Sequence, residues 1–549
     1  MKLARIVRLA AALSVAMSAA SFGFAQQAPQ QSAPAKPKLI VFMVVDGLPQ
    51  WQITAYRDQL APDGFARFLE RGTWFANAHY GHSFPVTSAG HATMLTGAYP
   101  NRTGIIDNEW LDQTTGEVTY CTGDTSATYI GHQTARLDGT SPKNLLAETV
   151  GDVLRRSDPK SRVIGMSGKD RGAILTAGKA GVAYMYMDDG DFASSTFYMP
   201  EHPAWVNGFN AKKPADRYFR QSWTALLPQQ AYARSVPDDQ PWYGPGGGRL
   251  PMMTADANQA RPGRNFYRSL QLGPFGDTLL LEFARAAIAG EQLGQDDSPD
   301  IITISLSGHD YVNHAFSAES RISHDHLLQL DRMLQAFFKD LDATVGKDNY
   351  LAMLTADHGF APTPEYAVTK GLPAGRMSLG QALRQVNADL DKRFGVQKLV
   401  MGISGPTLLL DKKLIAQEKL DIDTVADAAR TALMAEPGLA VAYTRAELLS
   451  GSRAGDPLFA QMRKSWNKDR SGEVEFALRP YWIPGRGVAT HGSPYDYDTH
   501  VPILVWGPRW IKPGRVDARV EVVDIAPTLS RILGIAVPSM SEGKLLPLP

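Results

Sequence analysis

The chain has 549 residues, of which 44% are hydrophobic, so it can bury a large core and has room for more than one domain. Its 56 basic and 56 acidic residues balance, which argues against a general affinity for nucleic acid or anionic membranes. Cys121 is the single cysteine, so an intramolecular disulfide is excluded and a structural thiol is expected there.

The first 25 residues have the pattern of a secretory signal peptide. Lys2, Arg5 and Arg8 precede an apolar run, and small residues end that run at Ala25, after which we expect cleavage. A membrane anchor is the alternative, but the run is too short to span a bilayer comfortably. Residues 26–37 are rich in Pro, Gln and Ala and are expected to form a flexible lead-in. With no later membrane span in the sequence, the mature protein is expected to be soluble and exported, either periplasmic or extracellular.

Residues 38–45 (KLIVFMVV) are continuously apolar, which predicts a strand buried on both faces, as in a parallel sheet. The strand ends at Asp46, where α/β sheets build binding sites. A single Asp at such a place is more often a helix cap or a turn residue. Residues 64–72 then predict an amphipathic helix.

Residues 82–97 are dense in hydroxyl groups and lead into a short helix. Hydroxyl residues before a helix are commonly plain N-caps. The free N–H groups of a helix start also favour negative charge, which suits a nucleophilic alkoxide or a bound phosphoryl group. Ser83, Thr87 and Ser88 are rival candidates for that role, and Asn108 follows them.

Residues 145–155 predict a helix and residues 161–166 a short strand, which runs into Lys169-Asp170-Arg171. Two cations at a strand end can converge on one anion, although a solvated charge cluster is the commoner explanation. From about 182 to 276 the sequence is rich in Trp, Tyr, Pro, Asp and Gly without clear periodicity. We interpret this segment as an insertion that caps the site and contributes no strand to the sheet.

Two further buried strands are predicted after a helix over residues 277–288. Residues 300–307 lead into Asp310 and His314, which are four apart and can face one metal ion. Residues 350–355, after a helix over 324–338, lead into Asp357 and His358. Three buried strands that end in Asp or Asp/His favour a metal centre at one end of a parallel sheet. Oxygen and nitrogen ligands without thiolate favour zinc or another borderline divalent ion.

Residues from about 362 to 486 are interpreted as a second insertion, with a helix over 424–434 and a strand over 406–410. His491 then follows in Thr490-His491-Gly492, before a strand over 501–506 and a closing helix over 522–533. We therefore expect one α/β catalytic domain over residues 38–549, with a central, mostly parallel sheet sandwiched by helices and with cap insertions.

Taken in order, these motifs resemble those of the alkaline phosphatase superfamily, and in particular its threonine-nucleophile, phosphate-irrepressible alkaline phosphatases of PafA type. The resemblance covers residues from about 38 to 533 and is specific because six motifs occur in the right order. The motifs are Asp46 at a strand end, Thr87-x-x-x-His91, Lys169-Asp170-Arg171, Asp310-x-x-x-His314, Asp357-His358-Gly359 and Thr490-His491-Gly492.

The resemblance implies two Zn²⁺ ions as cofactors. One would be bound by Asp310, His314 and His491. The other would be bound by Asp46, Asp357 and His358, together with the oxygen of Thr87. It also implies Thr87 as the nucleophile, and Asn108, Lys169 and Arg171 as the contacts to the non-bridging phosphate oxygens. His91 is expected to be structural, and His309, His324, His326 and His500 are expected to bind no metal.

The implied activity is hydrolysis of a broad range of small phosphate monoesters through a covalent phospho-Thr87 intermediate, by a monomer with no dedicated nucleic-acid partner. The main alternative is a phosphodiesterase or nucleotide pyrophosphatase on the same scaffold. That branch lacks the Lys-x-Arg pair, so Lys169 and Arg171 favour monoesters. The sulfatase pattern C/S-x-P-x-R is not met at Cys121, which is followed by Thr-Gly-Asp-Thr. A non-catalytic binding protein that keeps the fold is a third alternative.

Overall fold

The computed structural model describes residues 36–549 except 245 and 257, and residues Lys36–Pro549 form one compact unit. The predicted signal peptide, and the lead-in up to residue 35, lie outside the described residues. Within the described ranges, no helix combines the length and the apolar character needed to cross a bilayer.

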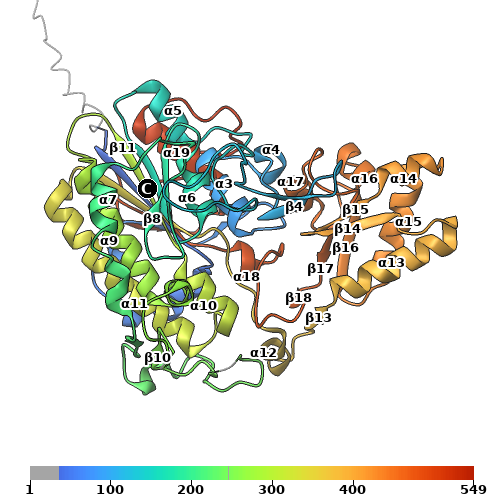
Figure 1. The fold of residues 1–549 in the computed structure, drawn as a ribbon, viewed down its shortest axis with the longest axis horizontal. Helices are drawn as coiled ribbons and strands as arrows, with labels where there is room; N and C mark the ends of the chain where they lie inside the picture. Colours follow the sequence, from blue (N-terminus) through green and yellow to red (C-terminus); the bar gives the residue numbers. More distant parts are fainter. Residues whose placement is uncertain (1–35, 245, 257) are drawn as a thin grey trace, which may run out of the picture. The chain divides into compact units, whose positions relative to one another are not determined.

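A nine-stranded sheet forms the centre of the unit, in the order β20-β2-β19-β12-β1-β11-β6-β7-β8 (Figure 1). Its five middle strands, from β12 to β7, run parallel, whereas β19 and β8 are antiparallel to their neighbours β12 and β7. The predicted α/β class with a mostly parallel sheet is therefore confirmed. The strands are β1 (Leu39–Val45), β2 (Thr73–Phe75), β6 (Val163–Ser167), β7 (Val182–Tyr186), β8 (Phe192–Ala193), β11 (Asp300–Leu306), β12 (Tyr350–Thr355), β19 (Ile503–Trp506) and β20 (Gly514–Val516).

Helices cover both faces of the sheet (Figure 1). One group consists of α3 (Thr87–Thr96), α5 (Val150–Ser157), α6 (Asp170–Ala177) and α19 (Ile525–Leu533). The other consists of α7 (Ala204–Asn210), α9 (Pro274–Gly290), α10 (Gly308–Phe316) and α11 (Arg321–Leu341). All residues of β1, β11 and β12 are buried, because apolar side chains from both layers pack on them.

The expected first insertion starts later than residue 182. β7 and β8 pair within the central sheet, so the prediction that residues 182–276 add no strand to the sheet was wrong over 182–193. β7 has only five residues and lies next to the edge strand, so it lacks the long apolar run that identified β1. The remainder packs beside α11, where Trp223 Nε1 donates to the buried carboxylate of Asp325 at 2.6 Å.

A second, antiparallel sheet lies within the segment predicted as the second insertion (Figure 1). Its order is β14-β15-β17-β16, with β14 (Val400–Ser404), β15 (Thr407–Leu410), β16 (Leu439–Thr444) and β17 (Val474–Leu478). The helices α13 (Leu379–Phe394) and α15 (Ile422–Met434) pack on it around a hydrophobic cluster of its own. We call residues 379–478 the small-sheet segment.

A buried polar contact joins the small-sheet segment to the central body. Ser83, which precedes α3, donates from its backbone N and from its hydroxyl to Ser465 Oγ, each at 2.9 Å. The Ser83 hydroxyl also lies 3.4 Å from Oε1 of Glu475 in β17. Burial raises the pKa of Glu475 well above its ordinary value, and the Ser83 hydrogen bond offsets only part of that shift.

Gly90 lets α3 pack directly on the end of the central sheet. A Cβ atom at Gly90 would lie 2.1 Å from the carbonyl oxygen of Asp357, which is backbone and cannot turn away. We expect Gly90→Ala to lower the free energy of unfolding by about 2 kcal/mol, because the clash outweighs the gain of ~1 kcal/mol that Ala brings to a helix. Urea denaturation measures the change. Gly208→Ala in α7 is the control, since open space surrounds that position, and equal effects of the two substitutions would contradict the proposed packing.

Glu475 should make stability fall as pH rises above about 4.5. A carboxyl with a raised folded pKa destabilises the folded state as pH rises above the unfolded value, ~4.5 for Glu, toward the folded one. We therefore expect Glu475→Gln to match the wild type below that value and to gain up to about 1.4 kcal/mol per pH unit above it. Urea midpoints across the pH range test this, with Glu70→Gln on the exposed surface as the control. A constant offset between Glu475→Gln and wild type would refute the assignment.

Candidate active site

The ends of three neighbouring strands bring three carboxylates together. Asp46 follows β1 directly, Asp310 lies in the first turn of α10 after β11, and Asp357 lies two residues after β12. Because β1 lies between β11 and β12, these side chains meet at one edge of the sheet. All three are buried, so their negative charges need compensation in place.

The acidic residues form two groups with histidines. In each group, one potential ligand atom per residue lies within 4.8 Å of the others. The first group is Asp46, Asp357 and His358, and the second is Asp310, His314 and His491. Apart from the Thr87 oxygen, these are the two sets that the family resemblance implies.

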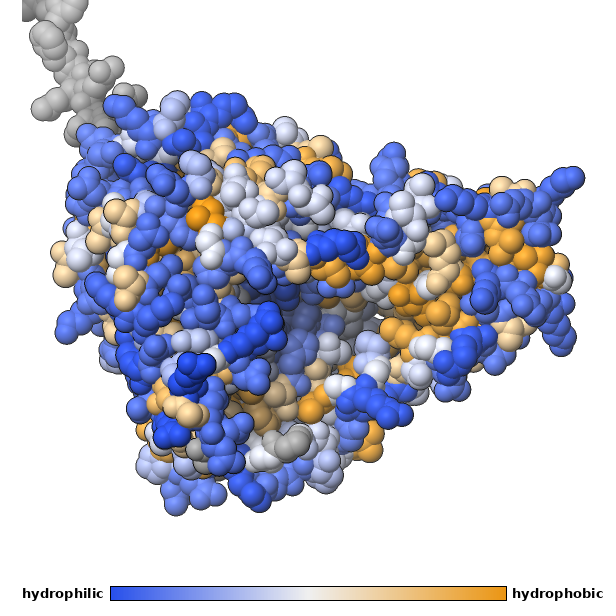
Figure 2. Space-filling model, in the orientation of Figure 1, coloured by the Kyte–Doolittle hydropathy of each residue, from blue (hydrophilic) through white to orange (hydrophobic). Residues whose placement is uncertain are grey.

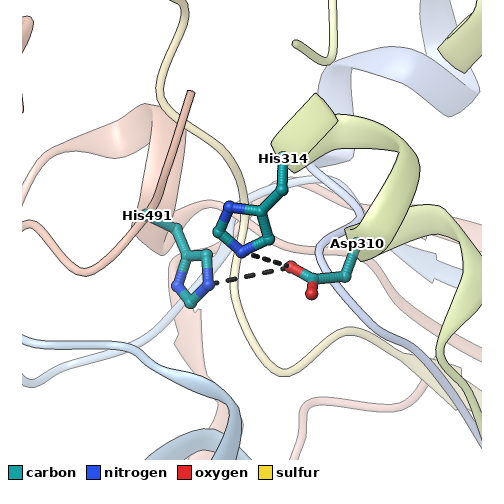
Figure 3. Close-up of side chains that lie close together, drawn as sticks. All are labelled: Asp310, His314 and His491. Carbon is teal, nitrogen blue, oxygen red and sulfur yellow. Dashed lines mark ion pairs between the residues drawn. The ribbon is translucent and has the colours of Figure 1, made fainter. Parts of the chain in front are cut away.

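Figure 3 shows how the second group converges from α10 and from the loop that carries His491. The Nε2 atoms of His314 and His491 lie 3.4 and 3.7 Å from Asp310 Oδ1. The two groups adjoin, because His358 Nε2 lies 3.9 Å from the same oxygen and its ring stacks on that of His491 at 3.3 Å between centroids.

Backbone carbonyl groups fix the orientation of all three histidines. Nδ1 of His358 lies 2.9 Å from the carbonyl oxygen of Gly359, and Nδ1 of His314 lies 3.1 Å from that of Ala489. Nδ1 of His491 lies 3.2 Å from the carbonyl oxygen of Pro85. A carbonyl accepts but cannot donate, so each Nδ1 carries a hydrogen and each Nε2 is directed at the carboxylates.

The donor set fits divalent metal ions. Oδ1 of Asp46, Oδ1 of Asp310, Oδ2 of Asp357 and Nε2 of His358 are buried without a hydrogen-bond partner. Buried polar atoms in that state are costly, so their concentration in one place points to a cation. Carboxylate oxygen and imidazole nitrogen are ligands that zinc and similar ions accept.

Lys169 lies between the two groups. Its Nζ is 2.7 Å from Asp46 Oδ2 and 2.5 Å from Asp310 Oδ2, and the side chain is buried. Burial alone would raise the pKa of Asp46, but the nearby ammonium holds it well below its ordinary value. The same balance lowers the pKa of Asp310, and the two carboxylates keep the pKa of Lys169 raised despite its burial.

The pKa values of the two stacked histidines, His358 and His491, shift in opposite directions. Burial acts to lower the pKa of His358, but the nearby carboxylates of Asp357 and Asp46 raise it to about 9. Burial lowers the pKa of His491 well below its ordinary value, and the adjacent His358 lowers it further. One proton is therefore held on His358, since two imidazolium ions stacked this closely would repel each other.

The hydroxyl-rich stretch adjoins the first group. Thr87 is buried and is the first residue of α3, and His91 one turn later donates to its carbonyl at 2.7 Å. His91 Nδ1 also lies 3.2 Å from Asp357 Oδ2, which agrees with its expected structural role. Of the rival hydroxyls, Ser83 is engaged by Ser465, whereas Ser88 Oγ is buried without a partner. The backbone N of Ser88 donates to Asn108 Oδ1 at 3.0 Å, which places Asn108 at the start of the helix.

Tyr120 is a site residue that the sequence motifs did not indicate. Its hydroxyl donates to Asp170 Oδ1 at 2.5 Å and accepts from Arg171 Nη1 at 3.3 Å, so it holds the guanidinium in place. Tyr120 ends β5 (Val118–Tyr120), which pairs with β4 (Glu109–Leu111) immediately after Asn108. The sequence feature that could have indicated Tyr120 is this hairpin, because it brings the chain back from Asn108 toward Arg171.

The remaining histidines lie outside the two groups. His309 and His326 contact each other at 3.2 Å between their Nδ1 atoms, and His309 Nε2 binds Gln52. His324 binds Ser235 and Gln59, and His500 binds the carbonyl of Ala76. A third, more exposed group of possible ligands comprises His132, Asp189 and Asp191, but Lys213 already pairs with Asp191 at 2.8 Å.

Comparisons with known proteins identify the family. Residues 40–482 match the model of the type I phosphodiesterase / nucleotide pyrophosphatase family. The chain is 34% identical over 94% of its length to the alkaline phosphatase PafA of Elizabethkingia meningoseptica, of which 95% is covered. It is 35% identical over 93% of its length to the alkaline phosphatase PhoV of Synechococcus elongatus, of which 92% is covered.

The crystal structure of wild-type alkaline phosphatase PafA superposes with a TM-score of 0.86 at 33% identity, covering 94% of this chain and 99% of that one. The predicted resemblance is thereby confirmed over nearly all of the described residues. The chain belongs to the type I phosphodiesterase / nucleotide pyrophosphatase family of the alkaline phosphatase superfamily, as a relative of the PafA-type alkaline phosphatases.

Proposed function

We propose that the protein is an alkaline phosphatase that hydrolyses a broad range of small phosphate monoesters. The observation that carries the proposal is the pair of adjoining Asp/His groups, with unpartnered ligand atoms, at the start of α3. The similarity to PafA and PhoV supports it, since both are named alkaline phosphatases. The sequence signals at residues 1–25 support export to the periplasm or the cell exterior, and we propose that the enzyme acts there as a monomer.

In this proposal each Asp/His group holds one Zn²⁺ ion. Asp310, His314 and His491 would bind one ion, and Asp46, Asp357, His358 and the Thr87 oxygen would bind the other. Bound ions of this kind lower the pKa of a hydroxyl group and stabilise negative charge on a leaving oxygen. The Nδ1 bonds to Gly359, Ala489 and Pro85 orient the three imidazole rings, so that each Nε2 would face its ion.

Thr87 is the proposed nucleophile. Thr87 releases its hydroxyl proton to solvent, its Oγ1 attacks phosphorus while the ester P–O bond breaks, and the alcohol leaves with a proton taken from water. The phosphoryl group is then esterified to Thr87. A water molecule attacks this phosphorus in turn, the bond to Thr87 Oγ1 breaks, and inorganic phosphate departs. The position of Thr87 at the N-terminus of α3 favours the negative charge of both the alkoxide and the phosphoryl group.

Three side chains are proposed to bind the non-bridging phosphoryl oxygens. Asn108 accepts from Ser88 through Oδ1, so its Nδ2 remains to donate. Arg171 is oriented by Tyr120, and its Nε is buried without a partner. Lys169 adds a second positive charge. A monoester dianion offers one more charged oxygen than a diester, and these two cations are the groups that would recognise it.

The metal assignment predicts the metal content of single variants. We expect the wild type to hold two zinc equivalents after dialysis, and Asp310→Asn to hold about one, because each group lacks sufficient ligands without its carboxylate. Elemental analysis of dialysed protein measures both. Asp189→Asn, in the third group, should retain two equivalents and serves as the control. An unchanged metal content in Asp310→Asn would refute the assignment.

Lys169 and Arg171 are expected to contribute more to monoesterase activity than to diesterase activity. We expect Lys169→Ala combined with Arg171→Ala to lower kcat/KM for an aryl phosphate monoester by about 10³-fold, because two charged donors to the transition state are lost. The kcat/KM for the matched diester should fall by less than about tenfold, since a diester lacks the second charge. Arg264→Ala with Arg268→Ala, an exposed pair bound to Asp188, is the control. A dominant diesterase activity that survives the substitution would assign the protein to the phosphodiesterase alternative.

A further inference from the structure

A cavity of about 330 Å³ opens beside the second Asp/His group. His314, His491 and Asn108 lie on one side of it, so any molecule inside would lie next to the reacting phosphoryl group. The opposite side is formed by the small-sheet segment and by β18 (Trp482–Pro484). Figure 2 shows the surface hollowed between the region of α10 and α18 (Asp496–Thr499) and the region of β17 and β18.

The residues that the small-sheet segment and β18 contribute to the cavity lining are apolar. β17 contributes Phe476, and the segment around β18 contributes Trp482, Ile483 and Pro484. Leu379 from the start of α13 and Pro406 complete this surface. Figure 2 shows hydrophobic residues gathered over the small sheet on this face of the molecule.

Phe84 forms a rigid part of the same lining. A Cβ atom at Gly492 would lie 2.9 Å from its ring, and one at Gly405 would lie 3.2 Å from it. Both glycines have positive φ angles, +101° and +51°, so other residues there would be strained as well as crowded. Two loops from different parts of the chain therefore close on the Phe84 ring and fix its position.

The charges around the cavity are distributed unevenly. The lining includes neither Lys nor Arg from the described part of the chain, and Asp498 is its one carboxylate. The two cations that address the phosphoryl group, Lys169 and Arg171, lie outside the lining. A second anionic group bound in the cavity would meet apolar surface and a carboxylate, with no cation to compensate its desolvation.

We infer that this cavity binds the leaving group of the substrate and selects uncharged, ring-bearing alcohols over alcohols that carry a further anion. The inference rests on the proposed function. That function assigns the Thr87 oxygen to the first Asp/His group, so the second group would face the leaving oxygen of an in-line displacement. Phosphate esters of cyclic alcohols are the favoured class. Pyrophosphate and esters with a second phosphate or phosphonate are disfavoured. The small-sheet segment thereby sets substrate preference, although it contributes none of the proposed metal ligands.

The test uses alkyl phosphates whose alcohols have closely similar acidity, so that intrinsic reactivity cancels. We expect kcat/KM of the zinc-loaded full protein to be about ten- to a hundredfold higher for cyclohexylmethyl phosphate than for ethyl phosphate, because the ring is removed from water. Butyl phosphate should exceed 3-phosphonopropyl phosphate by about tenfold or more, because the cavity lacks a cation for the phosphonate.

Two variants locate the preference in the cavity. Phe84→Ala should lower the ratio of cyclohexylmethyl to ethyl phosphate by about fivefold, and any disturbance of Thr87 cancels in this ratio. Leu379→Lys places a cation on the lining and should raise kcat/KM for 3-phosphonopropyl phosphate relative to butyl phosphate, by about threefold or more. Phe197→Ala is the control, since this ring is 41% exposed and lies outside the lining.

The outcomes distinguish an error in the leaving-group assignment from an error in the proposed function. Equal kcat/KM for cyclohexylmethyl and ethyl phosphate, or ratios unchanged in both variants, would overturn the leaving-group assignment while phosphomonoesterase activity stands. Turnover of none of the esters, with two zinc equivalents bound, would overturn the proposed function and this inference together.

Discussion

The dominant constraint in this structure is the burial of three carboxylates at the ends of three adjacent parallel strands. Asp46, Asp310 and Asp357 would repel one another in a medium of low polarity, and nothing in the hydrophobic packing offsets that repulsion. Positive charge must therefore converge on the same place. Lys169 after the end of β6, the oriented histidines and the N-terminus of α3 all converge there. The chemistry of the site follows from that compensation.

The two sheets have different roles. The central sheet fixes the polar groups, since a shift of one strand would separate ligands that must remain a few ångströms apart. The small sheet has its own hydrophobic cluster and its own helices, so its side chains can vary without disturbing β1, β11 or β12. It meets the central body through the buried contact of Ser83 with Ser465 and Glu475, only a few residues before α3. A segment with an independent core next to a fixed reaction centre is well suited to determine which substrates enter.

Sequence reasoning succeeded where local pattern and topology agree. Long apolar runs identified β1, β11 and β12, and their carboxyl ends had to lie together once the strands were parallel and adjacent. The spacing of Asp310 and His314 likewise follows from one turn of helix. It failed where tertiary packing decides: β7 is too short to be recognised. Of the small sheet, the sequence predicted β15 and the adjacent α15, but not the pairing of the four strands. The position of Tyr120 beside Arg171 depends on a hairpin whose direction the residues do not specify. His491 was assigned only through the family resemblance, because it lies in a loop that no periodicity describes.

The hydrogen bond from His491 to the carbonyl of Pro85 ties two functions to one piece of backbone. Pro85 has a restricted φ angle and stands two residues before Thr87, so little slack separates the ring of His491 from the first turn of α3. The loop of His491, a proposed metal ligand, is thereby linked to the segment that carries the proposed nucleophile. A displacement of the His491 loop that keeps this hydrogen bond would move the backbone before α3, and a coupling of this kind acts in both directions. The His491 loop and the first turn of α3 are therefore expected to become ordered, or disordered, together.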